Sequence, residues 1–126
     1  MSKISITGAA GFVGVNLENY LKTSQDVESM RVRYLPNQQF DIKSDAIIHL
    51  AGKAHDLKKV SHPQDYYEAN FELTKQLFDA FLNSEAKVFV FMSTVKAVAD
   101  EVKGILSEDA IPNPKTHYGI AKHQAE

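Results

Sequence analysis

Three glycines spaced three residues apart are the first candidates for chemistry. Gly8, Gly11 and Gly14 lie in TGAAGFVG, directly after the apolar run KISIT at 3–7. When a helix follows a parallel strand, its free N–H groups and positive dipole end lie at the carboxyl edge of the sheet, where phosphate binds well. Gly8 permits the turn, Gly11 lets the backbone approach a pyrophosphate, and Gly14 allows close helix–strand packing. The spacing predicts a dinucleotide site; the alternative is a turn with a tight helix–strand contact.

A second group of reactive side chains comes later in the chain. Tyr118 and Lys122 lie in YGIAK, and a spacing of four residues puts both on one helical face. An ammonium near a phenol lowers the phenol pKa from about 10, so that it can exchange a proton with a sugar hydroxyl. Ser93 and Thr94 end the run KVFVFMST, at the edge where ligands bind in open α/β sheets. The alternatives are a solvated helix face and hydroxyls that only end a strand.

These residues fall between short apolar runs and longer segments with helical periodicity. The runs at 3–7, 30–35, 46–52 and 87–94 predict strands. The segments at 11–22, 61–81 and 117–126 predict helices, with Ser61 as N-cap and Pro63 in the first turn of the second one. This alternation predicts an α/β fold of the Rossmann type, a doubly wound parallel sheet with flanking helices.

Composition limits the classes of function. The chain has 126 residues and a net charge of −2, which fits one domain over 1–126 without a basic patch for nucleic acid. It has no apolar run long enough to span a membrane and no cysteine, and its histidines show no metal-ligand spacing. His49, inside an apolar run, is interpreted as a packed, hydrogen-bonded histidine. We therefore expect a cytoplasmic protein with no metal, membrane or nucleic-acid partner.

The order of the motifs resembles a known family. TGAAGFVG, then IIHLAG, an Asn in the next helix, FVFMST and YGIAK resemble the extended short-chain dehydrogenase/reductases over most of the chain. The nearest branch is the NAD(P)-dependent epimerase/dehydratase group, which acts on nucleotide sugars. The resemblance implies hydride transfer at C4 of the sugar, coupled to proton transfer through a tyrosine, with NAD or NADP as the cofactor.

The resemblance also assigns roles to individual residues. In the catalytic group, Thr94 is the hydroxyl, Tyr118 the general acid/base, and Lys122 the residue that holds the nicotinamide ribose and tunes Tyr118. The remaining residues belong to the cofactor site: Gly8, Gly11 and Gly14 with the amides of Phe12 and Val13 on the pyrophosphate, Leu50, Ala51 and Gly52 on the ribose side, Asn70 on the helix that shapes the site, and Ser93 beside the nicotinamide.

Two stretches depart from the family pattern. The acid expected to bind the adenosine ribose is replaced by Arg31 and Arg33, which favours NADP; the alternative is an exposed face of an edge strand. Asp41 and Ile42 resemble the pair that meets adenine, or else form an ordinary loop entry. STVKAVAD resembles the branch that reduces 4-keto nucleotide sugars in polysaccharide synthesis, which gives an alternative function.

The final predicted helix reaches Glu126 without a C-cap signal. We interpret the sequence as an N-terminal fragment that is truncated before the substrate-binding domain and catalytically inactive alone. We interpret the aromatic side chains of the helix at 61–81 as mostly core. Because members of the family often pair through this helix and the Tyr118 helix, the resemblance implies a homodimer that uses part of this face. A non-catalytic dinucleotide-binding sensor is the competing function, and Tyr118→Phe distinguishes it from an enzyme.

Overall fold

The fold is built on a four-stranded parallel sheet. The computed structural model describes residues 1–54 and 62–126, so the predicted N-cap Ser61 lies outside the described residues. The strands are β1 (Lys3–Thr7), β2 (Asp26–Met30), β3 (Ala46–His49) and β4 (Val88–Phe91), in the order β2-β1-β3-β4. Ile6 and Ile47 are fully buried at its centre. The predicted Rossmann-type α/β fold is confirmed.

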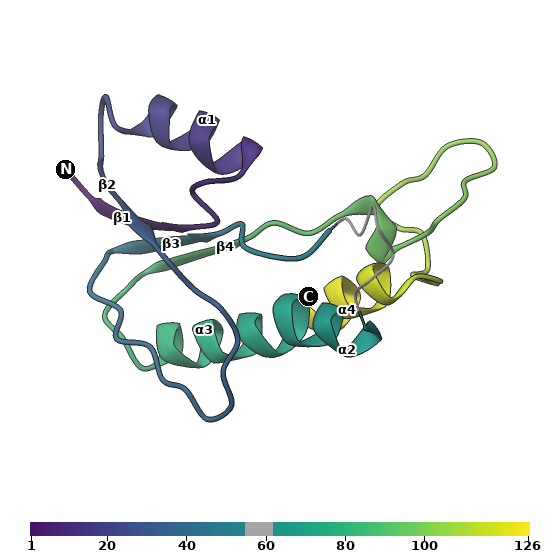
Figure 1. Ribbon diagram of the computed structural model, residues 1–126. Coiled ribbons are helices and arrows are strands. Elements are labelled where there is room, and N and C mark those ends of the chain that lie inside the picture. The colour runs from purple at the N-terminus through teal and green to yellow at the C-terminus, as the bar shows by residue number, and fades with distance from the viewer. Residues whose placement is uncertain (55–61) are drawn as a thin grey trace.

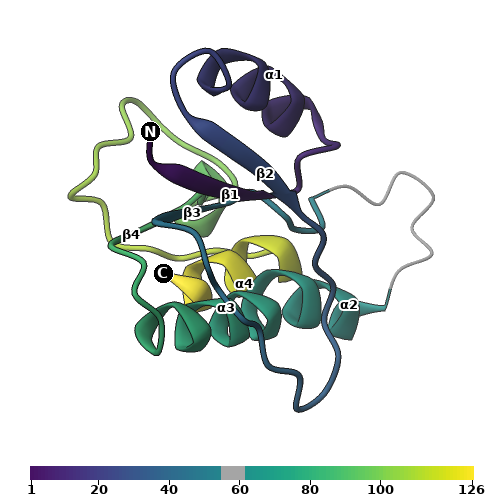
Figure 2. The same ribbon diagram turned by 90° about the vertical axis from the view of Figure 1, so that its left-hand side faces the viewer.

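Helices cover both faces of the sheet. In Figure 1 and Figure 2, α1 (Phe12–Leu21) lies over one face, above β1 and β2. The other face carries α2 (Pro63–Tyr67), α3 (Leu73–Leu82) and α4 (His117–Ala125). A short 3-10 turn, η2 (Val95–Ala97), follows β4. The carboxyl ends of all four strands therefore meet at one edge, which the N-termini of α1 and α2 and the η2 turn also approach.

A turn of π-helix interrupts the long helical segment. This turn, η1 (Glu68–Glu72), lies between α2 and α3 and contains Asn70, whose side chain is buried. Leu73 and Leu77 continue the buried face towards the sheet, as their spacing predicts. Wide turns of this kind occur often at functional sites, because they redirect the residues that they contain.

The second strand lies earlier in the sequence than predicted. The sequence predicts a strand at 30–35, but β2 ends at Met30 and the extended chain after it pairs with no strand. The parallel register explains the difference, since Met30 pairs with Thr7, the last residue of β1. At Gly8 the first strand turns away, so the segment after Met30 has no neighbour to pair with. Arg31 and Arg33 therefore follow the carboxyl end of β2.

Across the described ranges, 1–54 and 62–126, no helix is both long enough and apolar enough to cross a bilayer.

Candidate functional site

Two of the three glycines are required by the protein's own packing. Gly8 has φ +71°, and a Cβ there would lie 2.8 Å from the backbone nitrogen of Ala51. A Cβ on Gly14 would overlap the carbonyl oxygen of Gly8. Gly8 lets the turn after β1 lie against the backbone that follows β3, and Gly14 lets α1 pack against the backbone of that same turn.

Gly11 has no such structural reason to be glycine. Its φ is −77°, and an added Cβ would meet only the Gly8 oxygen, at an ordinary 3.4 Å. It is the N-cap of α1, and no side chain in the described ranges caps the helix there. The backbone amides of Phe12 and Val13 thus belong to the first turn of α1. They lie beside a space that a side chain at position 11 would fill. This arrangement fits a pyrophosphate, which needs free N–H donors and close backbone approach.

A cleft of about 580 Å³ lies in front of this turn. Gly8 and Gly11 line it on one side, and the loop after β3, residues 50–53, lines it on another. Arg33 also lines it. The structure therefore brings together the predicted pyrophosphate turn, the predicted ribose wall (Leu50, Ala51 and Gly52) and the arginine expected to read a 2′-phosphate.

Asn70 supports the wall of the cleft from behind. Its Oδ1 accepts a hydrogen bond from the Lys53 N–H at 3.0 Å, and its Nδ2 donates to the Lys53 carbonyl at 2.9 Å. A Cβ on Gly52 would overlap Asn70 Oδ1, so this glycine makes room for the pair of hydrogen bonds between Asn70 and Lys53. Since Asn70 is 1% exposed, it shapes the cofactor cleft through Lys53 rather than by direct contact.

The predicted catalytic residues lie at the same edge of the sheet. Thr94 caps the η2 turn, and its Oγ1 accepts from the Lys96 N–H at 3.3 Å. Tyr118 lies in the first turn of α4 and lines a smaller cleft, of about 420 Å³, with Ala54 and Lys96. Residues 53 and 54 belong to the cofactor cleft and the Tyr118 cleft respectively, so the two clefts are adjacent.

Gly119 determines how closely α4 approaches the Thr94 turn. A Cβ at Gly119 would overlap the Lys96 carbonyl oxygen, so the helix packs on η2 with no side chain between them. Thr116 caps the helix by accepting from the Gly119 N–H at 3.0 Å. The glycine that follows Tyr118 therefore has a structural reason. It makes the close contact with η2 that positions the start of α4, and with it Tyr118.

Lys122 belongs to α4, and its side chain is buried. Its Nζ donates to the Met92 carbonyl at 2.5 Å and lies 4.3 Å from the centroid of the Phe91 ring. Burial lowers the pKa of Lys122, and the negative charge of Glu126 opposes this shift. An ammonium group has three N–H donors, and the bond to the Met92 carbonyl uses one of them. The other two can bond a ribose hydroxyl or Tyr118.

Ser93 has a partner that the sequence analysis did not consider. Its Oγ donates to Glu126 at the end of α4. The predicted contact with a nicotinamide would compete with this bond. In the structure the hydroxyl instead helps hold α4 against the end of β4.

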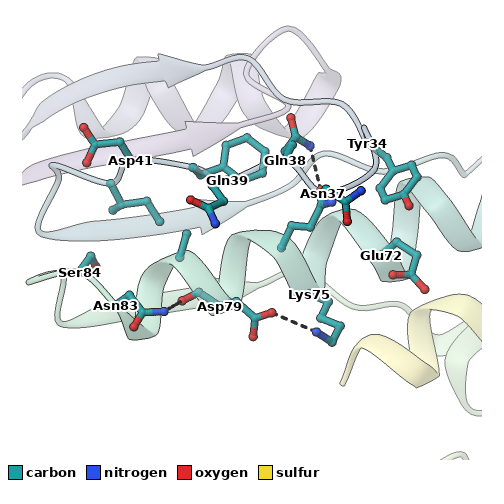
Figure 3. Close-up of a pocket in the computed structure, with 14 residues that line it drawn as sticks. Tyr34, Asn37, Gln38, Gln39, Asp41, Glu72, Lys75, Asp79, Asn83 and Ser84 are labelled. Carbon is teal, nitrogen blue, oxygen red and sulfur yellow. Dashed lines mark hydrogen bonds and ion pairs between the residues drawn. The ribbon is translucent and has the colours of Figure 1, made fainter.

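Asp41 and Ile42 are not brought to the cofactor cleft. They line another cleft of about 810 Å³, between residues 34–42 and α3, which Figure 3 shows and which shares Tyr34 with the cofactor cleft. Asp41 lies towards the end of that cleft where Asn83 and Ser84 lie. Because β3 begins at Ala46, a residue shortly before it lies towards the amino edge of the sheet. The adenine role of this pair stays a prediction.

Thr7 and Thr74 are site residues that the sequence analysis missed. They bond the two ring nitrogens of His49, at 2.7 Å and 2.9 Å. His49 is 1% exposed, and burial, with the Lys122 charge as a smaller cause, lowers its pKa to about 4. The interpretation of His49 as a packed, hydrogen-bonded histidine is confirmed. Only its place inside an apolar strand hinted at partners from other elements.

Sequence comparison agrees with this geometry. The sequence model of the NAD dependent epimerase/dehydratase family matches residues 4–126. The chain belongs to this family. The matched range includes the glycine turn, the Asn70 helix and the Tyr118 helix, which are the elements that form the two clefts.

Relatives in the family include epimerases and a reductase. The chain is 27% identical to a UDP-glucose 4-epimerase from Vibrio cholerae, with 98% of the chain and 44% of the relative covered. It is 27% identical to the solved UDP-glucuronic acid 4-epimerase from Bacillus cereus in complex with NAD, with a TM-score of 0.79 over 98% of the chain and 50% of that structure. It is also 26% identical to the solved dTDP-4-dehydrorhamnose reductase from Clostridium acetobutylicum. The TM-score is 0.80, and the match covers 98% of the chain and 47% of that structure. The chain thus spans about half the length of these proteins.

Proposed function

We propose that the protein is an NAD(P)-dependent oxidoreductase of the epimerase/dehydratase type that acts on a nucleotide sugar. The observation that carries the proposal is the cleft in front of Gly11, where an uncapped helix N-terminus faces the 50–53 wall. Family membership supports the same class of cofactor. The sugar would lie in the adjacent cleft beside Tyr118.

The chain's own residues supply binding and proton transfer. A bound nicotinamide would accept or give the hydride at C4 of the sugar. The Tyr118 hydroxyl would move the proton at the sugar O4, and the Thr94 hydroxyl would hydrogen-bond that oxygen. The buried Lys122 ammonium, one helical turn after Tyr118, would hold the nicotinamide ribose with the donors that the Met92 carbonyl leaves free.

A specific observation favours a reductase that uses NADPH as the second candidate. Arg33 lines the cofactor cleft just beyond the end of β2, where family members that bind NAD carry an acid. A guanidinium pairs well with a phosphate, so it suits an adenosine 2′-phosphate. The STVKAVAD stretch and the similarity to the Clostridium reductase support the same choice.

Cofactor binding is the decisive experiment. We would titrate the chain with NADPH and separately with NADH, followed by nicotinamide fluorescence. We expect saturable binding that is tighter for NADPH, and Gly11→Val should weaken it about 100-fold because its side chain fills the pyrophosphate space. The Cβ of that variant has room in the structure, so its fold should survive. Equal binding by native and Gly11→Val chains would refute the site.

The catalytic assignment needs the chain in a full-length context. Tyr118→Phe should lower turnover of a UDP- or dTDP-sugar by about 1,000-fold and leave the affinity for cofactor unchanged. Thr94→Val is the companion variant, since it removes a hydroxyl without changing the shape. A Tyr118→Phe enzyme that keeps its turnover would remove Tyr118 from the acid/base role. A native protein that binds cofactor but turns over no nucleotide sugar would support the sensor instead. Residues 1–126 alone should show no turnover.

We also propose a homodimer through α3 and α4. An apolar groove lies between them, lined by Phe71, Phe78, Phe91 and Ala125. Phe78 is 42% exposed and Leu82, one turn further along α3, is 63% exposed. A second copy would cover these side chains.

A further inference from the structure

The loop that walls the cofactor cleft is held by a closed ring of hydrogen bonds, buried where it passes through His49 and Thr74 and part-buried at the loop itself. At one end of the loop, the N–H groups of Leu50 and Ala51 donate to Thr7 Oγ1, each at 3.1 Å. At the other end, Asn70 clamps both backbone groups of Lys53. His49 connects the two ends across the core.

Counting donors and acceptors fixes the direction of every bond in the ring. A hydroxyl has one proton and two lone pairs. The Asn70 backbone carbonyl can only accept, so the Thr74 hydroxyl uses its one proton there and must accept from His49 Nε2. The Thr7 hydroxyl, which accepts from the Ala51 N–H and shares the Leu50 N–H with the Thr7 carbonyl, then donates its own proton to His49 Nδ1, 2.7 Å away. Nδ1 therefore carries a lone pair, and in a neutral ring the proton is on Nε2.

The far side of the ring follows the same direction. Thr74 Oγ1 donates its proton to the Asn70 carbonyl at 3.0 Å, so it is free to accept from His49 Nε2 at 2.9 Å. The path returns through Asn70 to Lys53. An imidazolium would break this order, because a proton on Nδ1 would take away the acceptor to which the Thr7 hydroxyl donates.

We propose that His49 is a positioning residue for the dinucleotide. It is held as the Nε2–H tautomer and joins Thr7 to Thr74, which fixes residues 50–53 at the distance from Gly8 and Gly11 that a dinucleotide needs. His49 does not line the cleft, so it acts through the loop. The inference rests on the proposed function, since it assumes that this cleft binds NAD(P)H.

The first test needs no substitution. Nitrogen-15 NMR of the imidazole in the native chain should show a proton on Nε2 and none on Nδ1, unchanged between pH 8 and pH 6. A proton on Nδ1, or a cationic ring at pH 6, would overturn the proposed ring. This result is independent of cofactor binding, so it stands even if the proposed function fails.

The second test asks whether the ring matters for the cofactor. Thr7→Val removes the hydroxyl at constant shape, and Thr7→Ser keeps it. We expect Thr7→Val to weaken NADPH binding about tenfold or more, and Thr7→Ser to bind like the native chain. A folded Thr7→Val chain with native affinity would overturn the positioning role.

Thr74 provides a second variant pair in case Thr7→Val does not fold. Thr74 lies in α3 and is 4% exposed, and its hydroxyl bonds His49 Nε2 and the backbone carbonyl of Asn70. Thr74→Val should weaken NADPH binding while Thr74→Ser restores it. Native affinity in Thr74→Val would contradict the proposal. Failure of the native chain to bind either cofactor would refute the proposed function, with the tautomer still decided by NMR.

Discussion

At the scale of single residues, one amino-acid type meets three different demands in the glycine turn. Gly8 adopts a left-handed backbone conformation and packs against the backbone of Ala51. Gly14 leaves room for the Gly8 carbonyl. Gly11 meets neither demand, because a Cβ would fit there. A glycine that the fold does not need is the one best explained by a ligand. The spacing of the motif alone could not separate these roles.

His49 gives the protein a predictable dependence of stability on pH. Burial, assisted by the Lys122 charge, lowers the pKa of His49 from 6.5 to about 4. Between these values the unfolded chain binds a proton that the folded chain does not. The free energy of unfolding should therefore fall as the pH is lowered from about 6.5 to about 4, by about 3 kcal/mol in all. Urea denaturation at several pH values measures this slope.

The matched control for this prediction is His49→Gln. Glutamine reaches the position of Nε2 but does not titrate, so its pH slope contains only the contributions of other groups. His62, His117 and His123 are exposed, and they remain in both proteins. The native slope should be the steeper one between pH 6.5 and 4. Identical slopes would show that His49 is protonated as easily in the folded chain as in the unfolded one.

At the scale of elements, the periodicity of the sequence located most of the fold. β1 lies at the predicted residues 3–7, and α1 and α4 lie within predicted helices. α3 ends at Leu82, one residue beyond the helix predicted at 61–81. The second strand was displaced because pairing with β1, rather than the alternation of side chains, determines where it ends. The partners of Ser93 and of His49 come from elements distant in sequence, which a local pattern cannot show. Asp41 precedes the first residue of β3 by five residues, and this position before the amino end of a strand is not visible in the motif alone.

The contact between α4 and the η2 turn is the element contact most sensitive to substitution. Gly→Ala inside a helix normally stabilises it by up to about 1 kcal/mol. At Gly119 the added methyl group would overlap the Lys96 carbonyl, so the sign should reverse. We expect Gly119→Ala to lower the free energy of unfolding by about 1–3 kcal/mol. Urea denaturation measures it, with the exposed Gln124→Ala on the same helix as control. A more stable Gly119→Ala chain would show that α4 does not pack here as described.

At the scale of the whole molecule, two apolar surfaces stand out as exposed among residues 1–54 and 62–126. One is the groove between α3 and α4. The other is the face of the sheet beside α1, where Val88 and Val90 of β4 are 49% and 42% exposed. Ile4 and Ile48 line the same hollow, with lysine and aspartate at its rim. Both surfaces are candidates for contact with more protein, so a test of self-association must distinguish them.

The proposed dimer uses the α3–α4 groove. We expect the native chain to sediment as a dimer at concentrations of tens of micromolar, since two copies would cover Phe78 and Leu82. Leu82→Lys should raise the dissociation constant at least about tenfold, because it places a charge in the interface. Val88→Lys is the matched control on the other surface and should leave the dimer intact. Circular dichroism establishes that both variants are folded. A native monomer would refute the dimer, and a dimer broken by Val88→Lys but not by Leu82→Lys would assign self-association to the open face of the sheet.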